Sequence, residues 1–188
     1  MKFLVTFLAL FCSALCYSQD NNHKHWSKDS LLTWSDFKGQ MLPSDNLDAF
    51  TYTNFNYTYT METIDGKSKP VFTVDNSFRY DKSWSKPDKQ TAALLQHEQG
   101  HFDISEYFGR QLLTAFNTYQ YTDNIKDERK AIFQKMKTEM AKMHELYDIK
   151  TKHSADAKMQ AKWNAFIALI LAQNVPLDDV IKSDFVTK

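Results

Sequence analysis

The amino-acid sequence predicts an α+β fold, in which a small antiparallel sheet is followed by three long helices. Residues 48–64 alternate apolar and polar side chains, and this period of two is typical of a half-buried strand. From residue 91 onward the apolar residues instead recur at helical spacing. Only 4 Gly and 4 Pro occur in the 188 residues, so little interrupts these helices.

The chain begins with the pattern of a secretory signal peptide. Lys2 precedes the apolar run FLVTFLALFCSALC, which is shorter than the roughly 20 residues of a spanning helix, and polar residues follow it. We expect residues 1–18 to be cleaved before Gln19 and the mature protein to be exported to the periplasm or the exterior. Lipoprotein anchoring at Cys16 is the alternative, although Leu15 fits the lipidation pattern poorly.

Charge and cysteine content narrow the function classes. The 23 Lys and Arg balance the 23 Asp and Glu. The chain therefore lacks the excess of basic residues that would indicate nucleic-acid binding. We expect no stable membrane span once the signal peptide is removed. Cys12 and Cys16 both lie in that peptide, so the mature chain has no disulfide and any zinc must be bound by His, Asp or Glu.

The first mature residues, 19–30, are polar, and we expect a flexible N-terminus. The segment LLTWSDFKG at 31–39 combines apolar residues with a Gly and is expected to pack at the start of one domain, residues 31–188. In the first strand the alternation places one side-chain set on a single face. That set is Phe55, Tyr57, Tyr59 and Met61.

A hairpin follows from the next residues. Asp65-Gly66 is a turn signal, and residues 71–80 read as the partner strand, with a further strand near 78–80 left open. We expect the aromatic face to pack on the helices, the alternative being a surface that binds a partner or glycan. The helices are predicted at residues 91–119, 123–147 and 155–173, with Pro87 before the first and Pro176 after the last.

Two histidines lie one helical turn apart in the stretch HEQGH, residues 97–101. Both imidazoles therefore lie on one helix face, where they can bind one Zn²⁺ at about 2.0–2.1 Å. Glu98 is rotated by about 100° from His97, so its carboxylate flanks the site and can accept a proton from a water there. This is the H-E-x-x-H pattern of metalloproteases.

The same helix face is apolar, which predicts that the two imidazoles are buried. Buried imidazoles need polar partners, and a metal is one such partner. The alternative is a histidine pair that only hydrogen-bonds to carboxylates or backbone groups. The residues that share this face with the pair are Leu94, Ile104, Phe108 and Leu112.

The third metal ligand must come from elsewhere in the chain. On a continuous helix Glu106 and Asp103 point away from His97. We favour His153, which follows the end of the second helical stretch and would complete a three-histidine site. The candidates left open are His144, Glu139, Glu145, Asp148 and His153.

Other polar residues have possible roles around such a site. Tyr147 can donate a hydrogen bond to a developing oxyanion, or it can simply cap the core. Asp103 and Asp148 can orient the ligand imidazoles without binding the metal, or serve as helix caps and surface charges. His23 and His25 are expected to be solvated in the N-terminus.

The segments LTWSDFKG, HEQGHFDISE and YDIKTKHS, with Trp163 downstream, resemble a secreted bacterial family, the domain of unknown function 922, described as predicted zinc-dependent proteases. The resemblance covers residues 31–163. It implies a zincin-like domain with His97 and His101 as metal ligands and Glu98 as the base. His153 matches the later histidine of the family, which favours it as the third ligand.

We therefore expect a secreted zinc metallopeptidase that acts on a peptide or protein substrate. Zn²⁺ is the expected cofactor, Glu98 the general base and Tyr147 a second catalytic group. The alternative is a non-catalytic exported binding or structural module, with a structural metal or none. A metal hydrolase of other substrates is a third possibility.

Overall fold

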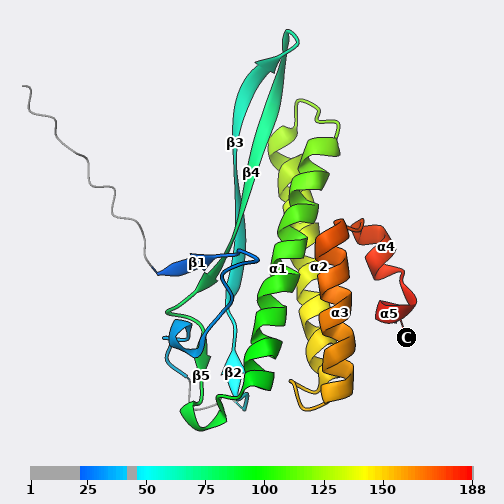
Figure 1. Cartoon of the computed structure of the whole chain (residues 1–188). Coiled ribbons are helices and arrows are strands. Elements are labelled where there is room, and N and C mark those ends of the chain that lie inside the picture. The colour runs from blue at the N-terminus through cyan, green and yellow to red at the C-terminus, as the bar shows by residue number, and fades with distance from the viewer. Residues whose placement is uncertain (1–21, 42–45, 188) are drawn as a thin grey trace, which may run out of the picture.

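The computed structural model describes residues 22–41 and 46–187, so the predicted signal peptide lies outside the described residues. The predicted fold class is confirmed: a small antiparallel sheet is followed by long helices that run side by side (Figure 1). The long helices are α1 (Ala92–Thr118), α2 (Ile125–Thr151) and α3 (Ala157–Gln173).

The predicted hairpin is the longest part of the sheet. Strands β3 (Thr53–Ile64) and β4 (Lys67–Arg79) pair antiparallel along their length, from Thr53 opposite Phe78 to Ile64 opposite Lys67. Asp65 and Gly66 connect them with φ values of 52° and 73°, which is the left-handed pair that a two-residue hairpin turn requires. Because β4 continues to Arg79, the possible separate strand near 78–80 is wrong.

The N-terminal segment is ordered by the sheet where it is described. Strand β1 (His23–His25) pairs antiparallel with the end of β4 and gives the strand order β1-β4-β3. Lys24 also forms an ion pair with Asp36 at 3.1 Å. These contacts hold residues 22–26 against the sheet, whereas the expected flexibility of residues 19–30 stays a prediction, and residues 19–21 lie outside the described part.

The predicted first strand is interrupted after Phe50. Strand β2 (Ala49–Phe50) pairs with β5 (Trp84–Ser85) in a separate two-stranded sheet. This small sheet lies beside the beginning of α1 (Figure 1). Two short 3-10 helices, η1 (Trp34–Asp36) and η2 (Pro87–Lys89), lie in the connections.

The start of α1 follows local capping, but the end of α2 does not match its prediction. Thr91 caps α1 by accepting a hydrogen bond from the backbone N–H of Leu94 at 3.1 Å. Helix α2 continues four residues past the predicted end at 147, to Thr151, and places Asp148 inside the helix. Two short helices follow Pro176 and were not predicted: α4 (Leu177–Ile181) and α5 (Asp184–Thr187).

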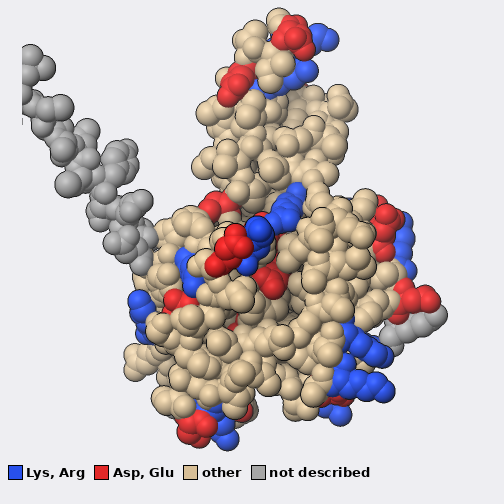
Figure 2. Space-filling model, viewed as in Figure 1, with Lys and Arg blue, Asp and Glu red and all other residues tan. Residues whose placement is uncertain are grey.

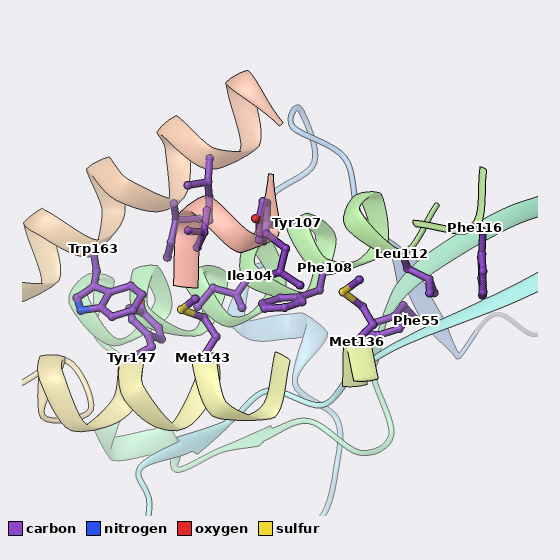
Figure 3. Packing of buried hydrophobic residues seen from close by; sticks show 14 of the residues in the cluster. Phe55, Ile104, Tyr107, Phe108, Leu112, Phe116, Met136, Met143, Tyr147 and Trp163 are labelled. Carbon is purple, nitrogen blue, oxygen red and sulfur yellow. The ribbon is translucent and has the colours of Figure 1, made fainter. Parts of the chain in front are cut away.

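Helix α1 forms the centre of the core, between the hairpin and the other helices (Figure 3). Phe72 of β4 stacks on Phe116 of α1 with ring centroids 4.3 Å apart, and Tyr57 contacts the same ring at 4.7 Å. The aromatic face of the hairpin therefore packs on the helices, as predicted. Met61 is an exception, 52% exposed, because the hairpin tip extends beyond the helix ends (Figure 1).

The surface carries acidic and basic side chains that are interspersed on the face shown in Figure 2. This pattern agrees with the balanced charge of the chain and gives that face no large field of one sign. Within residues 22–41 and 46–187, no helix has the length and apolar character needed to cross a membrane.

Candidate metal centre

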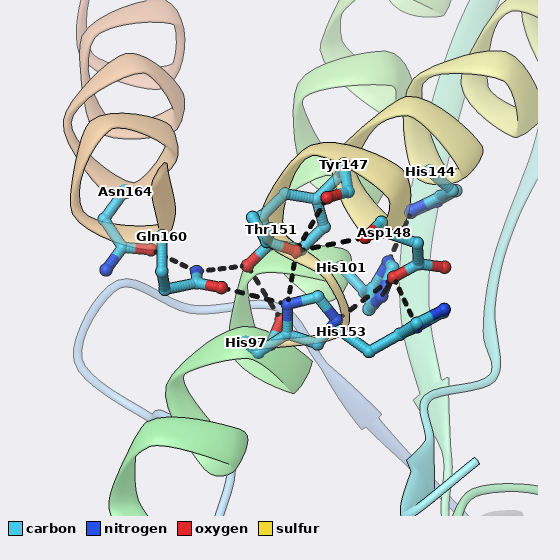
Figure 4. Close-up of polar contacts among 9 residues, drawn as sticks. All are labelled: His97, His101, His144, Tyr147, Asp148, Thr151, His153, Gln160 and Asn164. Atoms are coloured by element: carbon cyan, nitrogen blue, oxygen red, sulfur yellow. Dashed lines mark hydrogen bonds and ion pairs between the residues drawn. The ribbon is translucent and has the colours of Figure 1, made fainter. Parts of the chain in front are cut away.

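The two histidines of the HEQGH stretch meet an aspartate of α2. Helix α2 returns along α1, so its last turns lie beside the first turns of α1 (Figure 1). Oδ1 of Asp148 lies 3.1 Å from Nε2 of His97 and 3.0 Å from Nε2 of His101 (Figure 4). Three ligand-type atoms from two helices thus lie within 4.8 Å of one another.

These three side chains fit a zinc ion. Two ligand atoms bound to one Zn²⁺ at 2.0–2.2 Å lie roughly 3.0–3.6 Å apart for bond angles of about 95–110°. The 3.0 and 3.1 Å separations between Asp148 and the two histidines fall at the short end of that range. Two imidazoles and one carboxylate are also a donor set used by catalytic zinc sites, with a position left for water.

A closed loop of hydrogen bonds fixes which nitrogen of His97 carries the proton. The hydroxyl of Tyr147 donates to the backbone carbonyl of His97 at 3.1 Å, so it must accept from the amide of Gln160 at 2.6 Å. The same amide donates to Asn164 at 2.8 Å. Gln160 therefore presents its carbonyl oxygen to Nδ1 of His97, at 3.0 Å (Figure 4).

This arrangement leaves a lone pair facing a carboxylate. A neutral imidazole has one N–H, and in His97 the bond to Gln160 uses it at Nδ1. Nε2 then has only a lone pair toward Oδ1 of Asp148, which cannot form a hydrogen bond without a second proton. A metal cation bound between these atoms removes the conflict, because it accepts electron pairs from both.

The second histidine repeats this pattern. Nδ1 of His101 lies 2.9 Å from Nδ1 of His144. Burial, and to a lesser extent the charge of His101, lowers the pKa of His144 to about 3, so His144 is neutral and can accept. When His101 donates from Nδ1, its Nε2 lone pair faces Asp148, as in His97.

The pKa shifts of His101 and Asp148 show that a positive charge between these two side chains is favoured. Burial lowers the pKa of His101, but the hydrogen bond to Asp148 and the charges of Glu98 and Asp148 outweigh it and raise the pKa. Burial raises the pKa of Asp148, but the imidazoles of His101 and His97, when they carry a second proton, donate to its carboxylate and hold its pKa well below its ordinary value. In both residues the charged form is stabilised.

Glu98 lines the same cavity as the three ligand-type residues. The cavity has a volume of about 350 Å³ and is bordered on its other side by residues 46–51, which include β2. The Glu98 side chain is buried, at 3% exposure, and it forms no hydrogen bond or ion pair with the described residues. Its carboxylate is thus available to a ligand or water in the cavity.

The structure places His153 beside the centre rather than in it. Its Nδ1 lies 3.5 Å from Oδ1 of Asp148, its side chain is 55% exposed, and it borders the cavity. Helix α2 continues to Thr151, and the next three residues have positive φ values, which turn the chain away. Among the described residues, the ligand-type atoms that converge belong to His97, His101 and Asp148 rather than to the predicted three histidines, and the metal ligand set itself stays a prediction.

The contacts of Tyr147 and Asp103 favour structural roles, and their predicted catalytic and orienting roles stay predictions. Tyr147 is fully buried, stacks on the His97 ring at 4.5 Å and does not border the cavity, so it holds His97 in place and cannot reach an oxyanion there. Asp103 accepts hydrogen bonds from Trp26 and Gln99, both at 2.8 Å. It fastens the N-terminal segment to α1 and forms no hydrogen bond with His97 or His101.

The other candidates from the sequence do not join the centre. Glu139 forms an ion pair with Lys142 along α2, and Glu145 is exposed. Gln160 was missed, as was Thr151, whose hydroxyl lies 3.4 Å from Nδ1 of His97. A Gln in a third helix has no motif spacing to the histidines, so only the packing of α3 reveals it.

Comparison with known proteins gives one match. A family model described as bacterial protein of unknown function (DUF922) matches residues 29–154, which include the HEQGH stretch and Asp148 but end before Gln160. No curated protein matches the chain, and no solved structure does.

Proposed function

The chain belongs to the family of bacterial proteins of unknown function DUF922, and we propose that it is a zinc-dependent peptidase. His97, His101 and Asp148 would bind the zinc ion, and Glu98 would be the general base. Export to the periplasm or the exterior, as expected from residues 1–18, is part of this proposal.

One observation carries the proposal: the ligand-type atoms line the same cavity as Glu98, whose carboxylate has no hydrogen-bond partner among residues 22–41 and 46–187. A structural zinc site is closed by four protein ligands, whereas a catalytic site keeps a position open. Here three ligand-type atoms converge, and Glu98 borders the space beside them. This supports catalysis over a structural metal in a non-catalytic module.

Zinc bound at these residues would supply Lewis acidity, which favours proton loss from water and polarises a substrate carbonyl. Glu98 accepts the proton from the attacking water as the oxygen–carbon bond forms. It then delivers that proton to the amide nitrogen as the carbon–nitrogen bond breaks, so the products are a carboxylic acid and an amine. The low exposure of Glu98 keeps bulk water from competing for this proton.

The cavity wall supports a peptide as substrate. Residues 46–51 run along the cavity with Leu47 and Phe50 among its lining, and Leu94 lies on the helix side. Such a wall offers apolar contacts to a side chain next to the scissile bond. A volume of about 350 Å³ accommodates a few residues and not a folded domain.

The test is hydrolysis of a mixed peptide library, followed by mass spectrometry of the products. We expect cleavage by the zinc-loaded protein, loss of cleavage on chelation and recovery when zinc is returned. Glu98→Gln keeps the side-chain volume and should bind zinc normally, with a rate at least ~100-fold lower. If Glu98→Gln retains full activity, the assignment of the base is wrong.

A further inference from the structure

A second pair of histidines lies on β1, on a different element from the metal centre. His23 and His25 are two residues apart on a strand, so their side chains lie on the same face. Their Nε2 atoms are 3.1 Å apart, and the rings meet edge to face with centroids 4.7 Å apart. Both nitrogens are thus close enough to bind one ion.

A carboxylate of the neighbouring strand orients one of the two rings. Oδ1 of Asp75, on β4, lies 2.6 Å from Nδ1 of His25. The carboxylate accepts the Nδ1 proton, so in the neutral ring Nε2 of His25 carries a lone pair directed at His23. A carboxylate behind a histidine in this way is the usual support of a metal-binding imidazole.

The backbone holds the pair in position. His23 pairs with Arg79 and His25 with Ser77 in the β1–β4 ladder. Lys24, between them, points to the other face, where its ammonium group contacts Asp36 at 3.1 Å. The nearest positive side chain on the strand is therefore directed away from the two Nε2 atoms.

We propose that His23 and His25 bind a late first-row divalent cation, with Asp75 positioning His25. Two nitrogens bound to one ion at 2.0–2.1 Å with an angle near 100° are roughly 3.1–3.2 Å apart, which is the observed separation. Imidazole suits Cu²⁺, Ni²⁺ and Zn²⁺, and Cu²⁺ binds most tightly in that series. The exposed position of His25 and Asp75 leaves room for water to complete the coordination.

This site differs in kind from the centre on α1 and α2. It uses one exposed and one half-buried imidazole rather than a three-residue set that includes the buried His97, so it would exchange its ion more readily. Its ion would join β1 to β4 through Asp75 and so stabilise the N-terminal strand. The inference does not rest on the proposed peptidase activity, because none of these residues borders the cavity.

The test is calorimetric titration of the untagged protein with Cu²⁺ alone. The background carries His101→Gln and Asp148→Asn, which together remove two ligands of the buried centre. We expect saturable binding of one ion per chain that is lost in His23→Gln and in His25→Gln. Asp75→Asn should weaken it by about 10–100-fold. Electron paramagnetic resonance should show nitrogen coupling from imidazole.

His153→Gln in the same background is the matched control, because it removes another exposed histidine and should leave the affinity unchanged. Circular dichroism confirms that each variant is folded. Binding that survives both His23→Gln and His25→Gln overturns the proposal, as does no saturable binding below about 1 mM. The two rings would then share only a hydrogen bond. Failure of the buried centre to bind zinc would leave this result unaffected.

Discussion

Asp148 lies on α2, yet its Oδ1 atom is 3.0 Å from Nε2 of His101 on α1. This separation is too short for a lone pair and a carboxylate oxygen to face each other without a cation or a proton between them. His97 approaches the same oxygen at 3.1 Å, so both imidazoles converge on Oδ1 of Asp148.

The first prediction separates Asp148 from His153 as the third ligand. Asp148→Asn keeps the shape of the side chain but removes its charge, so zinc affinity should fall by at least ~100-fold, more than for loss of a supporting residue. His153→Gln should lower it by less than ~10-fold. Competition with a zinc-binding dye measures both. A larger loss of zinc affinity in His153→Gln than in Asp148→Asn would instead support the three-histidine site.

The second prediction concerns Gln160, which fixes the proton on Nδ1 of His97. Gln160→Leu removes the acceptor, so zinc affinity should fall by about 10–100-fold. Gln111→Leu is the matched control, because Gln111 is a buried amide that bonds Asn174 and Leu177 instead. Each variant should lose about 1–3 kcal/mol of unfolding free energy, but only Gln160→Leu should lose zinc affinity. Equal zinc affinity in the two variants would contradict the positioning role.

The third prediction tests the close packing of α2 on α1 at Gly100. A Cβ atom at Gly100 would overlap the hydroxyl group of Tyr147, which is fully buried and cannot retreat. Gly100→Ala should therefore lower the free energy of unfolding by about 1–3 kcal/mol and weaken zinc binding.

Gly109→Ala is its control on the same helix. The nearest atom to a Cβ there is Cγ1 of Val74 at 3.6 Å, an ordinary contact, so the change should stabilise the helix by about 0.5–1 kcal/mol. Urea denaturation measures both variants. A Gly100→Ala protein as stable as Gly109→Ala would show that Tyr147 is free to move.

The fourth prediction is a pH dependence of the metal-free protein. The raised pKa of His101 adds stability at pH below about 6.5, its ordinary value, and this stability is lost as pH rises through the raised pKa. The lowered pKa of Asp148 adds stability above about pH 3.9, which is lost as pH falls through its folded value. Their contribution is therefore greatest at roughly pH 4–6.5.

Zinc should change the alkaline side of this profile. The cation replaces the proton on His101, so metal affinity should rise with pH over the range in which that proton is lost. Urea denaturation between pH 5 and 8 should show stability falling with pH in a chelator and rising with zinc. Two profiles of the same slope would mean that zinc and the proton do not compete at His101.

Local signals explain which parts of the fold the sequence could predict. Asp65-Gly66 supplies the positive φ values of its turn, and Thr91 caps α1 with its own side chain, so both elements are predictable from a few residues. The HEQGH stretch likewise brings His97 and His101 together through helical spacing alone. The orientation of the aromatic face follows from alternation on β3.

The parts of the fold and of the candidate site that the sequence did not predict depend on contacts between segments far apart in the chain. The stretch after Tyr147 contains no Gly or Pro, so nothing local marks where α2 ends, and Lys152 closes it in the left-handed region. Because α2 is one turn longer than predicted, Asp148 rather than His153 lies next to His97 and His101. Gln160 is 63 residues from His97, and β1 is held by a ladder to β4 that its polar sequence does not indicate.

The most direct test of the central claim is an anomalous difference map at the zinc absorption edge, from crystals of the protein grown with zinc. We predict a strong peak about 2.0–2.2 Å from Nε2 of His97, Nε2 of His101 and Oδ1 of Asp148, beside the Glu98 carboxylate. A peak bound by His153 in place of Asp148 would contradict the ligand set. Absence of zinc from the two histidines would contradict the metal centre itself.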